Sequence, residues 1–271
     1  MAPCQPRYVT SARPAALRFS VCTLVASEQK YQRMLASFAR HGFDETNSEF
    51  IALDNRGENR FEGYSALRRI FPECRGEYIL FVHDDIELVE DGAERLLSIL
   101  RALDAADPLW AVAGNAGHRR AAPQELLRHL DDPHGLSRDL DGDAAPVEVQ
   151  GLDENFLVLR RSHMVFPSLD LEGFHLFATD LCLQARMAGG RAYVIPFFLR
   201  HHSGGNASPA LDRAIGQVGA KYGALRMPGR ILSPASTVYA GRRGRAQQFF
   251  DTRVLGTAAR MKRFAARLSG A

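Results

Sequence analysis

The amino-acid sequence predicts an α/β protein whose mostly parallel sheet is covered by helices on both faces. Apolar strand patterns alternate with amphipathic helical segments between residues 19 and 113, which is typical of consecutive strand–helix units. The run Tyr78-Ile-Leu-Phe-Val82 is apolar throughout, as expected for a central strand that is buried on both sides. The sequence shows no internal repeat.

The individual elements follow from residue spacing and from turn signals. In the segment 28–41, apolar residues lie at helical spacing on one face, and Gly42 provides a stop. The second strand runs directly into the polar pair Asp54-Asn55. Strands are expected at 19–25, 50–53, 78–82, 110–113, 147–149, 156–159 and 192–199. Helices are expected at 28–41, 63–71, 91–103 and 176–188.

Residues 118–146 differ in character from the segments around them. They contain the polar groups His118-Arg119-Arg120 and Asp131-Asp132-Pro133, and acids again between residues 139 and 143. We predict a loop-dominated insertion here, a candidate lid or acceptor-side segment.

Composition restricts the classes of protein that need to be considered. The net charge of +3 is too small for nucleic-acid binding across the whole surface. The four cysteines are far apart and form no CxxC pair, so they indicate neither a zinc site nor a disulfide framework, and Cys22 and Cys182 are expected as small core residues. The sequence has no signal-peptide pattern and no apolar run of membrane-spanning length. We therefore expect a reducing, cytoplasmic location.

The segment 241–271 is strongly basic. It carries many arginines against the single acid Asp251, and its apolar residues fall near helical spacing. Such a helix either lies on an anionic membrane surface, at the inner face of the membrane, or packs on the core with a solvated basic face.

The first polar cluster is His83-Asp84-Asp85, at the end of the apolar strand 78–82. Ligands of open α/β sheets bind beyond the carboxyl ends of the strands. Adjacent carboxylates repel one another unless a cation lies beside them, and Mg²⁺ or Mn²⁺ prefers oxygen ligands. The alternative is an acidic turn, or an N-cap for the helix that begins near Asp91.

A second and a third cluster lie further along the chain. Asp180 stands within an apolar helix pattern, where it is either a first-turn acid favoured by the helix dipole or a base placed in a pocket. His201-His202 follows the strand 192–199 and precedes Ser203-Gly-Gly205. Neighbouring strand residues point to opposite faces, so only one of the two histidines is expected to reach a site.

These clusters together carry a family resemblance. The chain resembles the inverting glycosyltransferases of family two, which have the GT-A fold. The resemblance lies in the order of three motifs: an apolar strand with His83-Asp84-Asp85, then Phe177-Ala-Thr-Asp-Leu-Cys-Leu-Gln-Ala185, then a strand with His201-His-Ser-Gly-Gly205. Within this family it is most similar to a bacterial branch whose strand ends in a histidine and a nearby acid. The resemblance covers roughly residues 19–205.

The resemblance implies roles on the donor side. His83-Asp84-Asp85 matches the DXD motif, so that Asp85 would bind the metal that bridges the donor diphosphate, while Asp84 would orient the sugar or ribose. Asp54 matches the acid that contacts the nucleobase. His83 stands at the first position of this donor-binding motif, where many members of the family carry aspartate.

The resemblance also implies catalytic and acceptor roles. Asp180 matches the catalytic base, although Thr179 stands where many members have glutamate. His201, or alternatively His202, matches the histidine that completes the metal shell. Asp153 matches a residue of the acceptor pocket, although a polar turn explains it as well.

The sequence therefore predicts a transferase that depends on Mn²⁺ or Mg²⁺ and moves a sugar from a nucleoside-diphosphate sugar to a glycan, lipid-linked or small-molecule acceptor. A single base without an enzyme nucleophile implies inversion at the anomeric carbon. The expected GT-A domain spans 17–240, with a nucleotide-binding half at 17–115 and an acceptor half at 145–240.

Other functions fit less well or lack parts. A dinucleotide-binding enzyme needs a glycine-rich turn after the first strand, where this chain has Ala26-Ser-Glu28. A metal-dependent hydrolase needs more histidines or acids at strand ends. A non-catalytic module of the same fold that binds nucleotide sugars stays open as the alternative.

Overall fold

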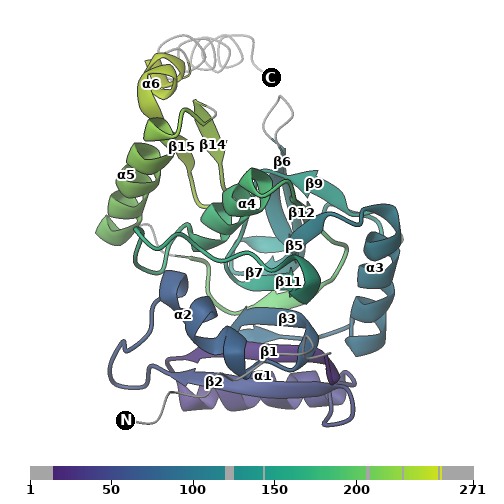
Figure 1. The fold of residues 1–271 in the computed structure, drawn as a ribbon. Coiled ribbons are helices and arrows are strands. Elements are labelled where there is room, and N and C mark those ends of the chain that lie inside the picture. The colour runs from purple at the N-terminus through teal and green to yellow at the C-terminus, as the bar shows by residue number, and fades with distance from the viewer. Residues whose placement is uncertain are drawn as a thin grey trace, which may run out of the picture.

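The computed structural model describes residues 15–119, 125–142, 144–205, 208–227, 229–249 and 251, and is built around a seven-stranded sheet (Figure 1). Helices cover both faces of this sheet, as the sequence predicts. In spatial order its strands are β2 (Ser48–Asp54), β1 (Leu17–Val25), β3 (Gly76–His83), β11 (Phe156–Arg160), β5 (Trp110–Gly114), β12 (Arg191–Val194) and β9 (Val147–Val149).

Most strands of this sheet run in the same direction. β1 is parallel to both β2 and β3, and β12 is parallel to β5. β11 lies antiparallel between β3 and β5, so these two share one direction, and β9 is an antiparallel edge strand. The prediction of a mostly parallel sheet is confirmed, and the carboxyl ends of β1, β2, β3, β5 and β12 meet at one edge.

Two layers of helices enclose the sheet. Successive residues of β3 enter different core clusters: Ile79 and Phe81 face one side, and Leu80 and Val82 the other, all nearly inaccessible to solvent. α1 (Glu28–Arg40) and α3 (Ala93–Ala106) cover one face. α2 (Gly63–Ile70), α4 (Phe177–Met187) and α5 (Pro209–Ala224) cover the other, and a 3-10 turn follows α2 at Phe71–Glu73.

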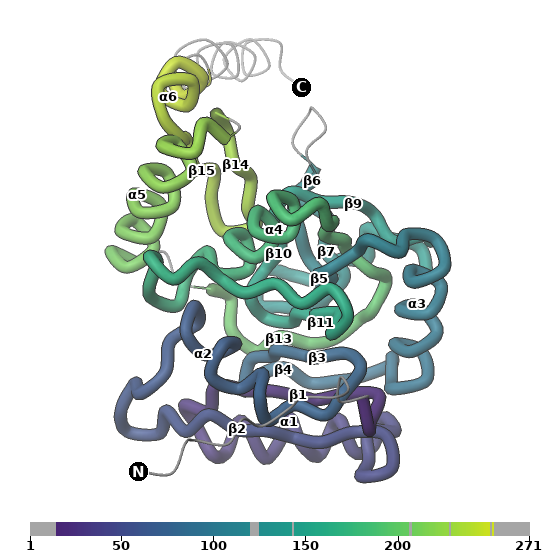
Figure 2. Tube along the Cα trace, in the orientation of Figure 1, coloured from purple at the N-terminus to yellow at the C-terminus, as the bar shows by residue number. Residues whose placement is uncertain are grey.

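The predicted strand 192–199 is wrong as a single element. It divides into β12 and β13 (Leu199–His201), which belong to different sheets. Pro196 lies in the break, and proline cannot donate a backbone hydrogen bond to a strand ladder. The break carries His201 out of the main sheet to β4 (Ile86–Glu87), with which β13 pairs (Figure 2).

The predicted loop at 118–146 is also wrong. Of the residues that the structure describes here, most form strands of a second sheet, in which β7 (Glu125–Asp132) and β8 (Gly135–Arg138) are a hairpin. Leu127, His129 and Leu130 of this hairpin are buried, although charged neighbours hide the pattern in the sequence. The strands of this sheet not yet given are β6 (Ala116–Arg119) and β10 (Gly151–Leu152), and a 3-10 turn occurs at Arg161–His163.

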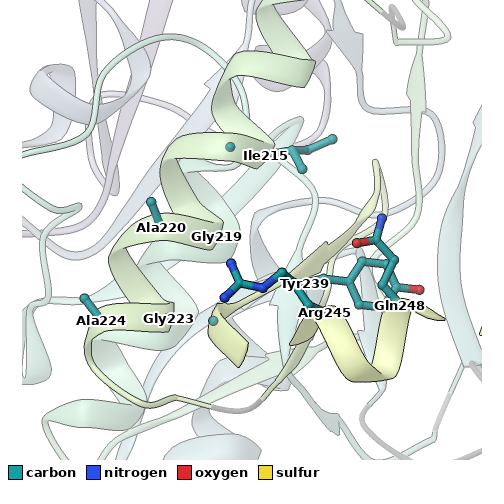
Figure 3. A pocket seen from close by; sticks show the side chains of 10 residues that line it. Ile215, Gly219, Ala220, Gly223, Ala224, Tyr239, Arg245 and Gln248 are labelled. Carbon is teal, nitrogen blue, oxygen red and sulfur yellow. The ribbon is translucent and has the colours of Figure 1, made fainter. Parts of the chain in front are cut away.

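The C-terminal part is a small unit beside the main sheet. α5 is followed by the hairpin of β14 (Arg230–Leu232) and β15 (Thr237–Tyr239), and then by α6 (Gly241–Phe249). α5 and α6 enclose a cavity of about 410 Å³ that is lined largely by small residues of α5 and by Tyr239 and Arg245 (Figure 3). No residue of the predicted site lines this cavity.

α6 forms the start of the predicted C-terminal tail. The tail residues 250 and 252–271 lie outside the described residues, so the alternatives of membrane contact and core packing stay predictions, as do the domain boundaries. Across the described residues, no helix combines the length and apolar character needed to cross a membrane. Cys22 and Cys182 are buried, which confirms them as core residues.

Candidate functional site

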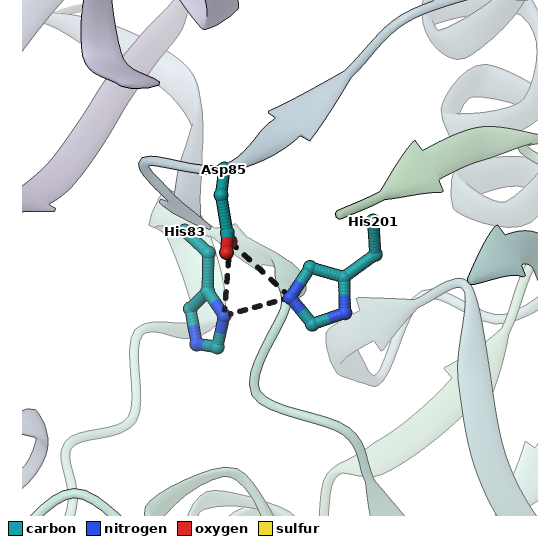
Figure 4. Close-up of side chains that lie close together, drawn as sticks. All are labelled: His83, Asp85 and His201. Atoms are coloured by element: carbon teal, nitrogen blue, oxygen red, sulfur yellow. Dashed lines mark hydrogen bonds and ion pairs between the residues drawn. The ribbon is translucent and has the colours of Figure 1, made fainter. Parts of the chain in front are cut away.

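Two histidines and a carboxylate converge at the carboxyl end of β3. His83 ends β3, Asp85 lies in the turn before β4, and His201 ends β13 (Figure 4). The Nε2 atom of His201 lies 3.3 Å from Asp85 Oδ1 and 3.3 Å from His83 Nδ1. The His83 Nδ1 atom lies 4.0 Å from Asp85 Oδ1. We call these three residues the His-Asp-His cluster.

Backbone pairing of neighbouring strands fixes this cluster in place. The His83 N–H donates to Asn155 O, and the His202 N–H donates to Asp85 O, both at 3.0 Å. Alternation along β13 then decides between the two histidines. His201 is buried within the cluster, whereas His202 Nε2 lies 3.1 Å from Glu87 Oε2. Of the two histidines predicted for the metal shell, only His201 therefore has its imidazole at the Asp85 carboxylate, whereas His202 contacts Asp85 through its backbone.

Electrostatics favour an ionised carboxylate and a neutral imidazole. Burial raises the pKa of Asp85, but the hydrogen bond from His201 and the positive charges of His201, His83 and Lys30 outweigh it and hold this pKa well below its usual range. Burial and the charge of His201 lower the pKa of His83. The Lys30 ammonium lies 3.2 Å from Asp85 Oδ2 and is about half exposed. A neutral His83 imidazole beside an ionised Asp85 carboxylate is ready to bind a cation.

The cluster fits one divalent ion. Donor atoms bound at about 2.1 Å to the same ion lie roughly 3.0–3.5 Å apart in tetrahedral or octahedral geometry. The two separations of 3.3 Å already meet this condition, and the 4.0 Å separation meets it after a small side-chain rotation. Within the described residues, His83, Asp85 and His201 are the group whose arrangement suits a metal ion. His83 belongs to this group, and its predicted contact with the donor stays a prediction.

Asp84 is turned away from this cluster. It is 8% exposed, and its Oδ2 atom accepts hydrogen bonds of 2.9 Å from the backbone N–H groups of Ala26 and Ser27. It therefore fixes the turn between β1 and α1, at the position where a dinucleotide-binding protein would have glycines. A direct contact of Asp84 with the donor stays a prediction, and the positioning of this turn is its observed role.

Asp54 lies at the same edge of the sheet. It pairs in register with Val25 of β1, while Leu24 pairs with His83. Its carboxylate is about half exposed and binds Arg56, whose hydrogen bonds lower the pKa of Asp54 to about 2. Because adjacent strands are about 4.8 Å apart, roughly 10 Å separate β2 from β3 at this edge.

The turn between β10 and β11 supplies two further acids. Asp153 is partly buried and accepts hydrogen bonds from Asn155, and its charge acts on the imidazole of His83. Glu154, which the sequence pattern did not single out, accepts the backbone N–H groups of Leu176 and Ala178. Burial and the charge of Asp153 raise the pKa of Glu154 to about 8.

Glu154 also compensates for an unusual helix start. Leu176 precedes α4 with a left-handed φ of 65° and provides no side-chain cap. A leucine in this region is strained, and such backbone strain is often found at functional sites. A sequence signal for Glu154 existed, because it directly follows Asp153, but nothing in the sequence shows which of the two acids is desolvated.

Asp180 lies inside the protein. It is completely buried, and both of its oxygens accept hydrogen bonds of 2.7 Å from Ser168, one from the N–H group and one from the hydroxyl. The Tyr222 hydroxyl donates a further hydrogen bond to it, and Gln184 binds both Ser168 and Tyr222. This carboxyl group connects α4 with α5 and exposes no atom to an incoming substrate, so its role as a base stays a prediction without geometric support.

Comparison with known proteins adds a family and a fold. No protein-family model matches the chain. The chain is 42% identical over 233 residues to the protein named ATP synthase subunits region ORF 6 from Fuscovulum blasticum, and the match covers 84% of this chain and 92% of that protein. This chain belongs to the ORF 6 family. The name of that relative refers to a gene region and states no activity.

Solved structures show the fold of this ORF 6 family member. It is similar to GalNAc-T7, whose crystal structure contains UDP, GalNAc and Mn²⁺, with a TM-score of 0.53 and 11% identity over 79% of this chain. The chain spans about half the length of that protein, at 52%. The mannosyltransferase PcManGT from Pyrobaculum calidifontis, solved with GDP-Man and Mn²⁺, gives a TM-score of 0.48 and 11% identity, over 84% of this chain and 70% of that one. The central sheet with its flanking helices is the GT-A fold, which confirms the predicted fold class.

Proposed function

We propose that this protein is a metal-dependent glycosyltransferase that moves a sugar from a nucleoside-diphosphate sugar to an acceptor hydroxyl with inversion. The observation that carries the proposal is the His-Asp-His cluster at the carboxyl edge of a GT-A sheet, next to a turn that Asp84 holds. Ligands of open α/β sheets bind at this edge.

The donor would lie along the row from Asp54 to Asp85. Asp54 would face the nucleobase, and His83, Asp85 and His201 would hold the metal. A divalent cation bound there supplies a counter-charge for the departing diphosphate. Lys30, an exposed ammonium beside Asp85, would bind the same phosphates from α1.

The donor set favours Mn²⁺ over Mg²⁺. Mg²⁺ requires oxygen ligands in near-ideal octahedral geometry, whereas imidazole suits the later transition ions. Two of the three side chains in the cluster are histidines. We therefore expect Mn²⁺ to support binding and turnover better than Mg²⁺.

We assign the base to Glu154 rather than to Asp180. Glu154 is partly exposed, and a pKa of about 8 is close to the value at which a general base works best near neutral pH. Asp153 beside it would contact the acceptor. Asp180 stays the alternative base. For this role, acceptor binding would have to expose Asp180 by separating it from Ser168 and Tyr222.

Incubation of the protein with a panel of nucleoside-diphosphate sugars, with and without Mn²⁺, tests the proposal. Transfer to an added alcohol, or slow Mn²⁺-dependent hydrolysis of a donor, supports the enzyme. Mn²⁺-dependent donor binding without turnover identifies the non-catalytic module. If no donor in the panel binds, both the enzyme and the non-catalytic module are rejected.

A further inference from the structure

A cavity of about 330 Å³ lies between the segment 172–175 and α5. This volume is within the lower part of the range of small-molecule sites. The segment is held in place by α2: Gly63 donates to Gly173 O at 3.0 Å, and Gly173 N–H donates to the carboxylate of Glu62. Gly173 has a φ of +104°, which a residue with a side chain rarely adopts, so the wall depends on a glycine here.

Three polar side chains of the cavity walls have no protein partner among the residues that the structure describes. Arg213 and Gln217 are four residues apart on α5 and therefore share one face of the helix. Glu172 comes from the opposite wall. Throughout the part of the chain that the structure describes, none of these three side chains makes a hydrogen bond or an ion pair, and all three residues are exposed.

An aromatic ring completes the cavity. Phe174 is 42% exposed, and its ring contacts no other aromatic ring of the described residues. Exposed phenylalanine at a cavity wall offers an apolar face to a ligand. His175, the next residue, contributes an imidazole whose Nε2 lies 3.4 Å from Ser208 Oγ.

The chemistry of the walls indicates the class of ligand. Charges of both signs disfavour a simple anion or cation, because either would meet a side chain of its own sign. An apolar ligand would displace water from the three polar side chains without replacing its hydrogen bonds. A saccharide satisfies both requirements, because its hydroxyls donate and accept hydrogen bonds while its C–H face packs on an aromatic ring.

The cavity is connected to the His-Asp-His cluster along two routes. The residue that follows the cavity wall, Leu176, donates its N–H group to Glu154, the proposed base. Ser208, which contacts His175, follows His201 by seven residues. An extended chain of that length spans at most about 25 Å, which limits the distance between Ser208 and His201. The cavity wall is therefore tied through Leu176 to the turn that carries Glu154.

We propose that this cavity is the acceptor subsite, which binds a saccharide unit through the ring of Phe174 and the polar groups of Glu172, Arg213 and Gln217. The assignment to an acceptor rests on the proposed transferase function, whereas the binding of a saccharide does not. The specificity for the acceptor would then be set by α5 and the segment 172–175, away from the metal.

Ligand-observed NMR with a panel of methyl glycosides of common hexoses and N-acetylhexosamines tests the proposal. The measurements compare the wild type with three variants: Phe174→Ala, the double variant Arg213→Ala/Gln217→Ala, and Leu169→Ala. Leu169 is 83% exposed and lies outside the cavity, so it controls for the loss of an exposed apolar side chain. Binding of a nucleoside diphosphate with Mn²⁺ is measured on the same samples.

We expect Phe174→Ala to weaken glycoside binding between about twofold and about tenfold, the contribution of an aromatic contact. The double variant should lose more, Leu169→Ala should match the wild type, and all should keep nucleotide binding. Equal glycoside binding in all variants, or none by the wild type, overturns the cavity assignment. A third outcome separates the two proposals. If the cavity variants lose glycoside binding and the wild type binds no nucleotide with Mn²⁺, the saccharide site is upheld and the transferase function is rejected.

Discussion

Replacing Asp180 by alanine separates a structural role from a catalytic one. The change removes the acceptor of three buried donors: the Ser168 N–H, the Ser168 hydroxyl and the Tyr222 hydroxyl. Each buried donor without a partner costs about 1–3 kcal/mol, so the loss should reach at least about 3 kcal/mol of unfolding free energy. At about 2–4 °C per kcal/mol for a protein near this size, the melting temperature should fall by about 6–12 °C.

Thermal unfolding followed by circular dichroism measures this loss, and donor turnover is assayed below the new melting temperature. We expect Asp180→Ala to keep most of its turnover per folded molecule, and Asp180→Asn, which retains a carbonyl oxygen, to lose less stability. The matched variant Glu154→Gln should keep its melting temperature within a few degrees and lose turnover. A stable Asp180→Ala protein without turnover would refute this reasoning and return the base to Asp180.

Three other predictions concern the same edge of the sheet. Turnover should rise with pH until the Glu154 carboxyl is ionised at about pH 8, and a rate–pH profile of Glu154→Gln that keeps this rise would contradict the assignment. Asp84→Ala leaves the N–H groups of Ala26 and Ser27 unpaired, so the free energy of unfolding measured with denaturant should fall by about 2–4 kcal/mol. An unchanged denaturation midpoint would argue against a positioning role of Asp84. Lys30→Met should weaken nucleoside-diphosphate binding in calorimetry but leave nucleoside binding unchanged; equal loss of both would exclude a phosphate contact.

The fold was largely predictable from the sequence because the central strands carry an uninterrupted apolar pattern. Residues 78–82 are buried on both faces, and the helix at 28–41 places its apolar residues at helical spacing. The hairpin of β7 and β8 was missed because charged and turn residues surround Leu127 and Leu130. The break at Pro196 was missed because the apolar pattern continues through it.

Prediction of the site was partial for a physical reason. Strand ends can be located in a sequence, so His83, Asp85 and His201 were found. The direction of each side chain depends on pairing between distant strands, and the β13–β4 pair that separates His201 from His202 cannot be inferred from spacing. The sequence also gives no measure of burial, which encloses Asp180 completely and raises the pKa of Glu154.

Direct titration of Mn²⁺ tests the central claim. Electron paramagnetic resonance counts free and bound Mn²⁺ for the wild type, for Asp85→Ala and His201→Ala, and for the controls Asp54→Ala and His202→Ala, which remove the same groups at the same edge. The account predicts one Mn²⁺ bound by the wild type and by both controls, with roughly tenfold weaker binding of Mg²⁺, and no Mn²⁺ bound by Asp85→Ala or His201→Ala. Mn²⁺ binding that is equal in all five proteins would contradict it.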